Sequence, residues 1–341
     1  MKISAGNKIR ITIGLSAVVF LICIAIGSIR ISIVDILCIM GHVIFGIDLP
    51  EHITPASVAI VWNLRLPRVL LAFLAGSALS VSGAVMQSIL RNPLASSFTL
   101  GVSSGASLGA SLVIFLGVSL PFLYLLTLPL LGFLFGLVTI ILAVTFASRL
   151  DGRMENNTII LTGMVFSLFI NAITTLMFAL NREGIQRMVF WQMGSFSMRD
   201  WQAIYILAPI AIAGVFYIYR FKRELDIMTF GEEQAETIGV NSSRVKWKLL
   251  ISSAAITGST IAFTGVIGFV DLVTPHVIRK IFGSSHRYVI PMSALAGGTF
   301  MALCDLAART AVPSVELPVG AVTAIIGAPF FAYVYFSKRN R

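Results

Sequence analysis

Long apolar stretches, separated by short polar ones, run through the whole chain. A helix that crosses the roughly 30 Å hydrocarbon layer of a membrane needs about 20 mainly apolar residues, because each residue adds about 1.5 Å. The stretches that approach this length are 11–29, 69–90, 100–120, 122–146, 158–180, 204–219, 249–269, 288–304 and 319–336. The pattern therefore predicts an all-α polytopic membrane protein.

The distribution of basic residues around these stretches predicts one further crossing. Segment 270–282 is too short and too polar to be assigned from hydropathy. If it crosses, and if the amino terminus is cytoplasmic, 18 of the 25 Lys and Arg residues lie on the cytoplasmic side. Such a bias fixes the orientation of membrane proteins. We therefore predict about ten transmembrane helices with both termini in the cytoplasm. The eighth should be a short helix that begins near Pro275 and is shielded from lipid by protein.

Composition supports a membrane protein and argues against several other classes. Hydrophobic residues make up 57% of the chain and charged residues 12%, whereas soluble domains average about 25% charged residues. The net charge of +10 arises from short clusters between apolar runs, which indicates membrane orientation rather than nucleic-acid binding. Cys23, Cys38 and Cys304 are too few and too scattered for a disulfide framework or a metal site.

The chain reads as a single transmembrane domain over residues 1–341. No linker is long enough to separate two domains, and the longest internal polar stretch is about 220–248. Gly101, Gly105 and Gly109 are spaced four apart, a pattern that lets two membrane helices approach closely. We expect these glycines to lie at a helix–helix contact.

The chain lacks the motifs of an enzyme or an autonomous ATP-driven pump. No Gly-Lys dipeptide occurs, so a glycine-rich phosphate loop is absent and any ATP must be hydrolysed by a partner. The four histidines lack the spacing of metal ligands, and no cofactor is indicated. The sequence therefore predicts a transport subunit without catalytic residues.

An ion-coupled secondary transporter is the second hypothesis. Such carriers place an ionisable residue near the middle of the membrane. The polar residues at that depth here are chiefly the neutral amides Gln87 and Asn171. Charged side chains are expected near the outer ends of helices, where water reaches them: Asp271, Asp305, Arg309 and Glu316. The pattern favours a carrier whose energy comes from elsewhere.

Short motifs in a fixed order connect the chain with one family. They fall at residues 65–68 (Arg-Leu-Pro-Arg), 83–87, 91–95 (Arg-Asn-Pro-Leu-Ala), 100–106, 191–195, 231–235, 238–241, 275–279, 305–309, 316–320 and 327–331. The chain resembles the permeases of the ABC importers for iron siderophores, haem and vitamin B12. Asp271 departs from the pattern, because the family usually has glycine there.

The resemblance implies a dimeric permease of the B12-importer type in the cytoplasmic (plasma or inner) membrane. Its implied partners are a second permease subunit, identical or similar, two cytoplasmic ATPase subunits and an external substrate-binding protein. A ferric siderophore is the expected cargo, because it is the commonest in the family, with haem and cobalamin as alternatives.

The resemblance also implies that Arg65, Arg68 and Arg309 receive acidic residues of the binding protein. Arginine suits this role because its planar group binds carboxylates through two hydrogen bonds. Arg65 and Arg68 are three residues apart, so both guanidinium groups should point to the same side of one helical turn. In the alternative interpretation, Arg68 caps a helix and Arg309 pairs with Asp305 at i, i+4.

A coupling segment for the ATPase is implied between the sixth and seventh crossings. Acidic residues at its beginning and a glycine at its end predict a short helix. The candidate residues are Gly231, Glu232, Glu233, Ala235, Gly239 and Val240. An ordinary amphipathic loop is the alternative.

The translocation path is implied along the fifth crossing, at Thr162, Ser167 and Asn171. Small, weakly polar side chains let a large cargo slide without being held. The same residues would equally suit helix packing.

Overall fold

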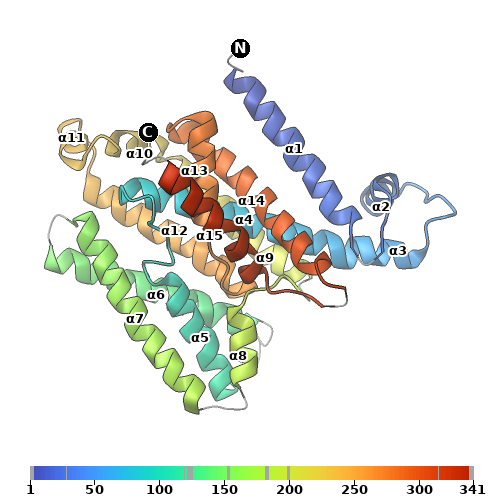
Figure 1. Ribbon diagram of the computed structural model, residues 1–341, viewed down its shortest axis with the longest axis horizontal. Helices are drawn as coiled ribbons and strands as arrows, with labels where there is room; N and C mark the ends of the chain where they lie inside the picture. The colour runs from blue at the N-terminus through green and yellow to red at the C-terminus, as the bar shows by residue number, and fades with distance from the viewer. Residues whose placement is uncertain are drawn as a thin grey trace.

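The computed structural model describes residues 4–27, 29–118, 120, 126–151, 154–180, 184–197, 200–313 and 315–337. The regular elements are α1 (Ala5–Ala25), α2 (Ile33–Phe45), α3 (Pro55–Ala59), the π-helical η1 (Ile60–Arg65), α4 (Leu66–Ile89), α5 (Val102–Leu116), α6 (Thr127–Leu150), α7 (Asn156–Leu180), α8 (Ile185–Gln192), α9 (Trp201–Tyr219), α10 (Lys222–Met228), α11 (Glu232–Thr237), α12 (Ser242–Thr264), α13 (Val270–Phe282), α14 (His286–Thr310) and α15 (Val319–Ser337) (Figure 1).

Each predicted crossing coincides with a helix. Among the described residues, six helical segments are long and apolar enough to span a membrane: α1, residues 55–89, α6, α7, α9 and α14. The apolar helices α5 and α15 are shorter. The predicted all-α polytopic fold is therefore confirmed.

Helix α4 forms the centre of the molecule. It packs against α9, α12, α13 and α14, and most of its residues are buried (Figure 1). Glycines allow two of these contacts to be unusually close. A Cβ atom at Gly297 would lie 2.5 Å from the carbonyl oxygen of Gly76, and one at Gly83 would lie 2.6 Å from the carbonyl carbon of Asp271. The backbones of α4, α13 and α14 thus touch directly.

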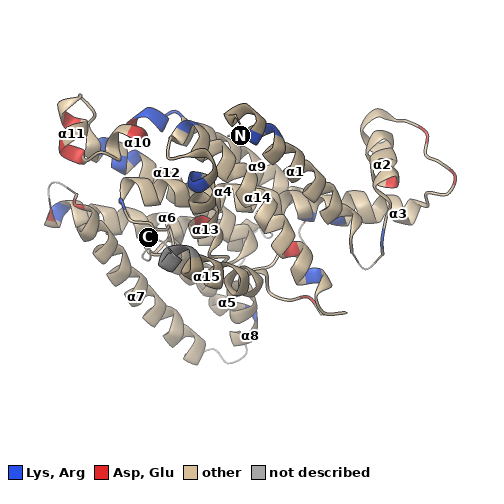
Figure 2. Ribbon diagram, turned by 45° about the horizontal axis from the view of Figure 1, so that its top comes forward, with Lys and Arg blue, Asp and Glu red and all other residues tan. Residues whose placement is uncertain are grey.

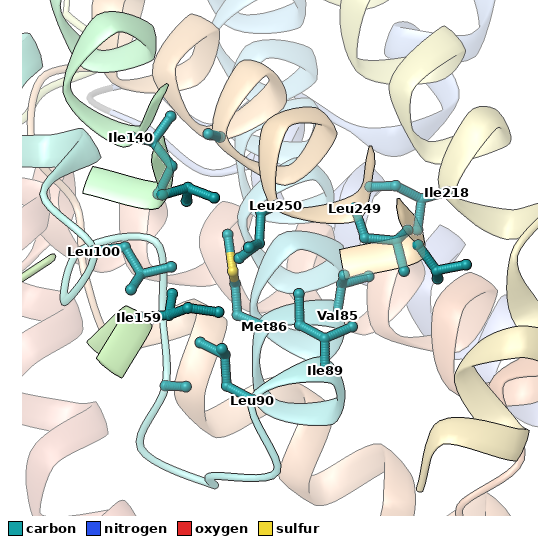
Figure 3. Packing of buried hydrophobic residues seen from close by; sticks show 14 of the residues in the cluster. Val85, Met86, Ile89, Leu90, Leu100, Ile140, Ile159, Ile218, Leu249 and Leu250 are labelled. Atoms are coloured by element: carbon teal, nitrogen blue, oxygen red, sulfur yellow. The ribbon is translucent and has the colours of Figure 1, made fainter. Parts of the chain in front are cut away.

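A large apolar cluster joins α4 to the helices around it. Figure 3 shows side chains of α4, α6, α7, α9 and α12 and of the segment before α5 meeting within this cluster. Its labelled members are Val85, Met86, Ile89, Leu90, Leu100, Ile140, Ile159, Ile218, Leu249 and Leu250. This packing holds the α5–α7 group against the centre of the molecule.

The glycine stripe lies at the start of α5, facing α6. A Cβ atom at Gly105 would lie 2.6 Å from the carbonyl oxygen of Phe135, and one at Gly109 would lie 2.5 Å from that of Leu131. Gly101 has a φ of +89° and precedes the first turn of α5, where its Cβ position faces α6 and α7. The four-residue spacing thus coincides with a close helix–helix contact.

Helix α13 begins earlier than predicted. It begins at Val270, five residues before Pro275, so the expected start near Pro275 was wrong. Proline has no N–H to donate to the carbonyl four residues earlier, that of Asp271. The side chain of Gln87 supplies the missing donor, because its Nε2 lies 3.2 Å from that carbonyl oxygen. A polar side chain of α4 therefore lets α13 continue through its proline.

Helix α2 was not anticipated as a separate element. Its 13 residues are apolar but too short to span the hydrocarbon layer. Ser32 caps its amino end, and Gly46 ends it in the left-handed conformation. Figure 1 shows α2 and α3 at the edge of the molecule opposite α11.

Candidate functional site

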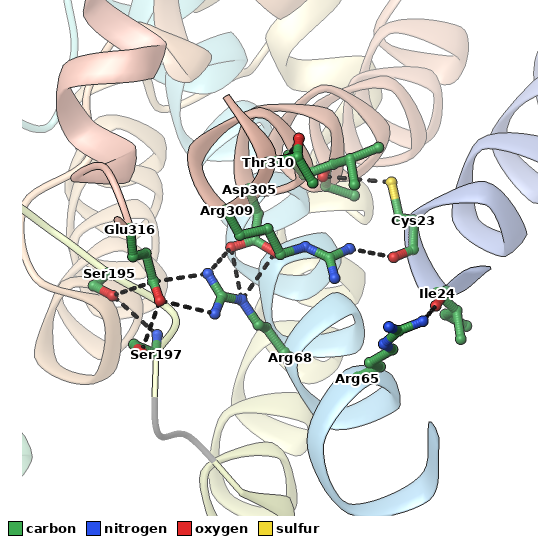
Figure 4. Close-up of polar contacts among 12 residues, drawn as sticks. Cys23, Ile24, Arg65, Arg68, Ser195, Ser197, Asp305, Arg309, Thr310 and Glu316 are labelled. Atoms are coloured by element: carbon green, nitrogen blue, oxygen red, sulfur yellow. Dashed lines mark hydrogen bonds and ion pairs between the residues drawn. The ribbon is translucent and has the colours of Figure 1, made fainter. Parts of the chain in front are cut away.

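A partly buried ionic cluster joins α4, α14 and the segment before α15. Arg68 Nη2 lies 2.8 Å from Asp305 Oδ1 and 2.8 Å from Glu316 Oε1, so one guanidinium group binds two carboxylates (Figure 4). Arg309 lies one turn after Asp305, with its Nε 3.5 Å from Asp305 Oδ2. We call Arg68, Asp305, Arg309 and Glu316 the arginine cluster.

Asp271 and Asp305 were both expected at positions that water reaches, and both expectations were wrong. Asp271 and Asp305 are not near water, because they are 3% and 0% exposed. In the interior, Asp305 is paired with two arginines, Arg68 and Arg309. Hydropathy alone carries no information about such pairing.

The guanidinium groups of Arg65 and Arg68 point to different partners rather than to the same side. Arg65 donates to the carbonyl oxygens of Ile24 and Ala25 at the end of α1 and of Ile29 beyond it, whereas Arg68 reaches α14 (Figure 4). The carbonyls at a helix carboxyl end are unpaired and carry partial negative charge, so they attract Arg65. The side chains of Arg65 and Arg68 diverge because their hydrogen-bond acceptors lie on different helices.

The structure brings Arg309 and Asp305 together as the alternative interpretation supposed. Arg309 also donates to the carbonyl of Cys23 in α1. The three arginines therefore connect α1, α4 and α14 within the chain.

Glu316 lies at the more exposed edge of the arginine cluster. Ser195 and Ser197 donate to its two carboxylate oxygens at 3.2 and 3.0 Å. Burial by itself would raise the pKa of this carboxyl, but the hydrogen bonds and charge of Arg68, with the two hydroxyls, outweigh burial and lower the pKa below its usual value. Glu316 is therefore ionised at neutral pH.

The candidate coupling segment forms a short helix at the edge of the molecule. Figure 2 shows α11 projecting there with its acidic residues in red and basic residues near α10 and the start of α12. The backbone turns through Gly231 (φ +135°) before α11 and through Gly239 (φ +91°) after it. Glycine is suited to both positions because other residues are strained there.

Two of the predicted coupling residues hold the segment to its own chain. Glu232 Oε1 lies 2.6 Å from Nζ of Lys246, a side chain with no exposed surface, and that amine also donates to the carbonyl of Met154 at 2.8 Å. Ala235 is likewise 0% exposed. These contacts fix the orientation of α11 on α12.

Other residues of the segment face outward. Glu233 and Gly239 are exposed, and Val240 is half-buried. Two large apolar side chains flank the helix in the open: Phe230 is 75% exposed and Ile238 is 69% exposed. Sequence reasoning missed both, although each lies directly beside a predicted coupling residue.

The three candidate path residues have different environments along α7. Thr162 is buried, Ser167 is half-buried and Asn171 is exposed. Thr162 and Asn171 are nine residues apart, which places them on opposite faces of a helix. The hydroxyls of Thr162 and Ser167 donate to carbonyls one turn earlier in α7, at 2.7 and 2.9 Å.

A second polar chain, not predicted from the sequence, connects α10 with α14, α4 and α13. Asp226 accepts from Nδ1 of His286 at 2.6 Å, Nε2 of His286 lies 2.7 Å from the hydroxyl of Ser88, and Arg279 donates to that hydroxyl at 3.1 Å. Asp226 also accepts from the backbone N–H of His286, the first residue of α14. No local spacing could reveal this chain, because its members come from four helices.

These features define a polytopic helical membrane protein with a short acidic helix, α11, at its edge. Comparison places it in a family: the chain belongs to the FecCD transport family, whose model matches residues 15–337. It is thus an ABC importer permease of the group that handles iron chelates, haem or vitamin B12.

Similar proteins agree with this assignment. YvrB, an ABC transporter permease protein of Bacillus subtilis, is 40% identical over 95% of this chain and 92% of its own. FecD of Escherichia coli, named as an Fe(3+) dicitrate transport system permease, is 36% identical over 82% of this chain and 86% of its own. An inward-facing structure assigned to a metal-chelate type ABC transporter aligns with a TM-score of 0.83 and 29% identity, covering 96% of this chain and 99% of that one.

Proposed function

We propose that this chain translocates a ferric siderophore across the cytoplasmic membrane, driven by ATP hydrolysis on separate subunits. The family match along nearly the whole chain carries the proposal. The lack of a Gly-Lys phosphate loop supports placing ATP hydrolysis on a partner. Relatives named for Fe(3+) dicitrate, haemin and vitamin B12 transport are 36%, 35% and 34% identical to this chain, so the choice among these cargoes falls to the competition experiment below.

Reconstitution tests this function. The chain is placed in proteoliposomes with its ATPase and binding protein, and uptake of a radiolabelled ferric siderophore is measured with and without ATP. Haemin and cobalamin serve as competing cargoes. Uptake that requires ATP and prefers the siderophore supports the proposal. Uptake by the chain alone along an ion gradient would instead support a secondary transporter.

We further propose that both termini are cytoplasmic and that segment 220–248 meets the ATPase there. Phe230 and Ile238 would be the anchors, because large apolar side chains exposed outside the membrane are typical of interfaces. Glu233, exposed between them on α11, adds a negative charge to this surface. Glu232 and Ala235 would act from within the chain by fixing α11.

Replacing Ile238 with serine is expected to weaken ATPase binding by about thirtyfold, equivalent to the ~2 kcal/mol of one interface anchor. Affinity is measured between the purified permease and ATPase, with uptake as a second readout. The matched control is Ile44→Ser on α2, which is 54% exposed and lies far from α11 (Figure 1). Equal losses in both variants, or none in Ile238→Ser, would contradict the proposed anchor.

Substitution at Ala235 tests the stability of the fold rather than the binding of the ATPase. Because Ala235 is buried, a leucine there should lower the melting temperature by overpacking, at a cost of about 1–3 kcal/mol. A loss of coupling in that variant would therefore not identify an interface residue. Ile238→Ser separates coupling from folding because its side chain is already exposed.

We propose that the binding protein docks near Arg65, Arg68 and Arg309 with its own carboxylates. Arg68 is the best placed, because its second partner, Glu316, lies at the exposed edge of the arginine cluster. An incoming carboxylate would replace Glu316 at the guanidinium group. Arg65 and Arg309 would support the region by holding α1 against α4 and α14.

If a carboxylate of the binding protein replaces Glu316 at Arg68, two variants should change the binding-protein affinity in different ways. Arg68→Gln should lower binding-protein affinity by about tenfold or more, because a desolvated charge contact is lost. Glu316→Gln should preserve or raise the affinity, because it removes the carboxylate that competes for Arg68. Affinity is measured by surface plasmon resonance alongside the melting temperature. A loss of affinity in Glu316→Gln would indicate that the cluster serves structure alone.

We propose that a second permease subunit completes the translocation path, which would include Thr162, Ser167 and Asn171. Asn171 is the most accessible of the three, so Asn171→Leu is the variant most able to change cargo flux without altering packing.

A further inference from the structure

A basic cavity of about 350 Å³ lies beside the ends of α4 and α13. Its lining residues are Gln87, Arg91, Pro93, His276, Arg279 and Lys280. Three of them carry permanent positive charge, and the lining contains no carboxylate. Positive charge is therefore concentrated around an accessible space that has no part in the arginine cluster or the coupling segment.

Arg279 has no acidic partner among the residues that the structure describes. It donates to three neutral acceptors of α4: the side-chain oxygen of Gln87, the carbonyl of Ala84 at 2.9 Å and the hydroxyl of Ser88 at 3.1 Å. Two other enclosed cations have acidic partners, since Arg68 binds two carboxylates and Lys246 binds Glu232, and buried Arg65 is bound by three backbone carbonyls away from this cavity. Enclosed charges in proteins are normally paired.

The helix dipole of α13 compensates the positive charge of the cavity only in part. Arg279 and Lys280 lie in the last turn of α13, where the helix carries about half an elementary negative charge for both to share. Arg91 adds a third cation immediately after α4, at a φ of +49°, a conformation rare for residues other than glycine. The cavity thus retains excess positive charge, and an anion would balance it.

We propose that this cavity binds a phosphate group, carried by an anionic phospholipid headgroup or by a free phosphate anion. Guanidinium and ammonium groups are the usual protein ligands for phosphate, and Arg279 is held in place by its three acceptors. With both termini cytoplasmic, as proposed above, Arg91 and Lys280 would lie at the cytoplasmic ends of two crossings, where lipid headgroups lie, so this position favours a lipid. Basic pockets between helices at the cytoplasmic surface are typical headgroup sites.

The test measures binding to the purified full-length chain without cargo or ATPase, so its outcome is independent of the transport proposal. Phosphatidylglycerol and phosphatidylcholine are titrated by native mass spectrometry, and inorganic phosphate by calorimetry. The variants are Arg91→Gln and Lys280→Gln, whose side chains are exposed and can be replaced without disturbing the fold. The matched control is Arg244→Gln, an exposed arginine at the start of α12 outside the cavity.

We expect tighter binding of phosphatidylglycerol than of phosphatidylcholine, with each cavity variant weakening it about fivefold and the control leaving it unchanged. Arg279→Gln should weaken it further, with its melting temperature as a check on folding. The site would be assigned to a free anion if the cavity variants weakened the binding of inorganic phosphate and the two lipids bound equally well. Equal effects of Arg244→Gln and the cavity variants, or no binding of either probe, would overturn the proposal.

Discussion

Replacing Asp305 with alanine is expected to lower the free energy of unfolding by about 3–5 kcal/mol, because it leaves enclosed cations without their shared carboxylate. Asp305 lies between Arg68 and Arg309 and has no exposed surface. Removing it leaves two guanidinium groups facing Glu316 as the only carboxylate of the cluster. The loss should appear as a lower melting temperature of the purified chain in detergent.

Two further variants define the cause of that loss. Asp48→Ala removes an exposed carboxylate that makes no ion pair within the described ranges, so it should leave the melting temperature unchanged. The combined replacement Arg68→Met, Asp305→Leu, Arg309→Met and Glu316→Gln should recover much of the stability, because a buried set of paired charges is often replaceable by uncharged residues of similar size. An unaltered melting temperature in Asp305→Ala would show that water or local rearrangement already stabilises the arginines.

Replacing Gly83 with valine is expected to cost about 3 kcal/mol or more and to reduce the yield of folded protein. A Cβ atom there would lie 2.6 Å from the carbonyl carbon of Asp271, so it would collide with the backbone of α13 rather than with a movable side chain. Displacing α13 would also break the hydrogen bond from Gln87 that replaces the one missing at Pro275.

The control for this prediction is Gly14→Val in α1. A Cβ atom at Gly14 would meet nothing within 4 Å, so the same substitution should leave folding intact. Yield and size-exclusion profile in detergent, followed by thermal unfolding, distinguish the two variants. Normal folding of Gly83→Val would mean that α4 and α13 can separate without losing the native structure.

The helical framework followed from the sequence because lipid imposes a simple length requirement on apolar stretches. Segments 69–90 and 158–180 correspond closely to α4 and α7 for this reason. Positive charge bias located α13, which hydropathy could not. Helix α2 was missed because its 13 residues fall below the length that the requirement detects.

The candidate site was less predictable, because its geometry depends on partners distant in sequence. Arg68 and Asp305 are separated by 237 positions, and no spacing rule links them. The predicted exposure of Asp305 was wrong because polar residues were judged one at a time, whereas its burial depends on neutralisation by Arg68 and Arg309. The acidic start of α11 and the glycine after its end were predicted because both signals are local. The outward position of Phe230 and Ile238 depends instead on how α11 packs on α12.

The meeting of Gly76 and Gly297 bears on how the molecule can change shape. Where two helix backbones touch, no layer of side chains remains between them to slide or repack. Helices α4 and α14 should therefore move as one rigid body when the permease changes between inward-facing and outward-facing conformations. Relative movement would instead occur between helices that are separated by side chains, such as α12 and α9.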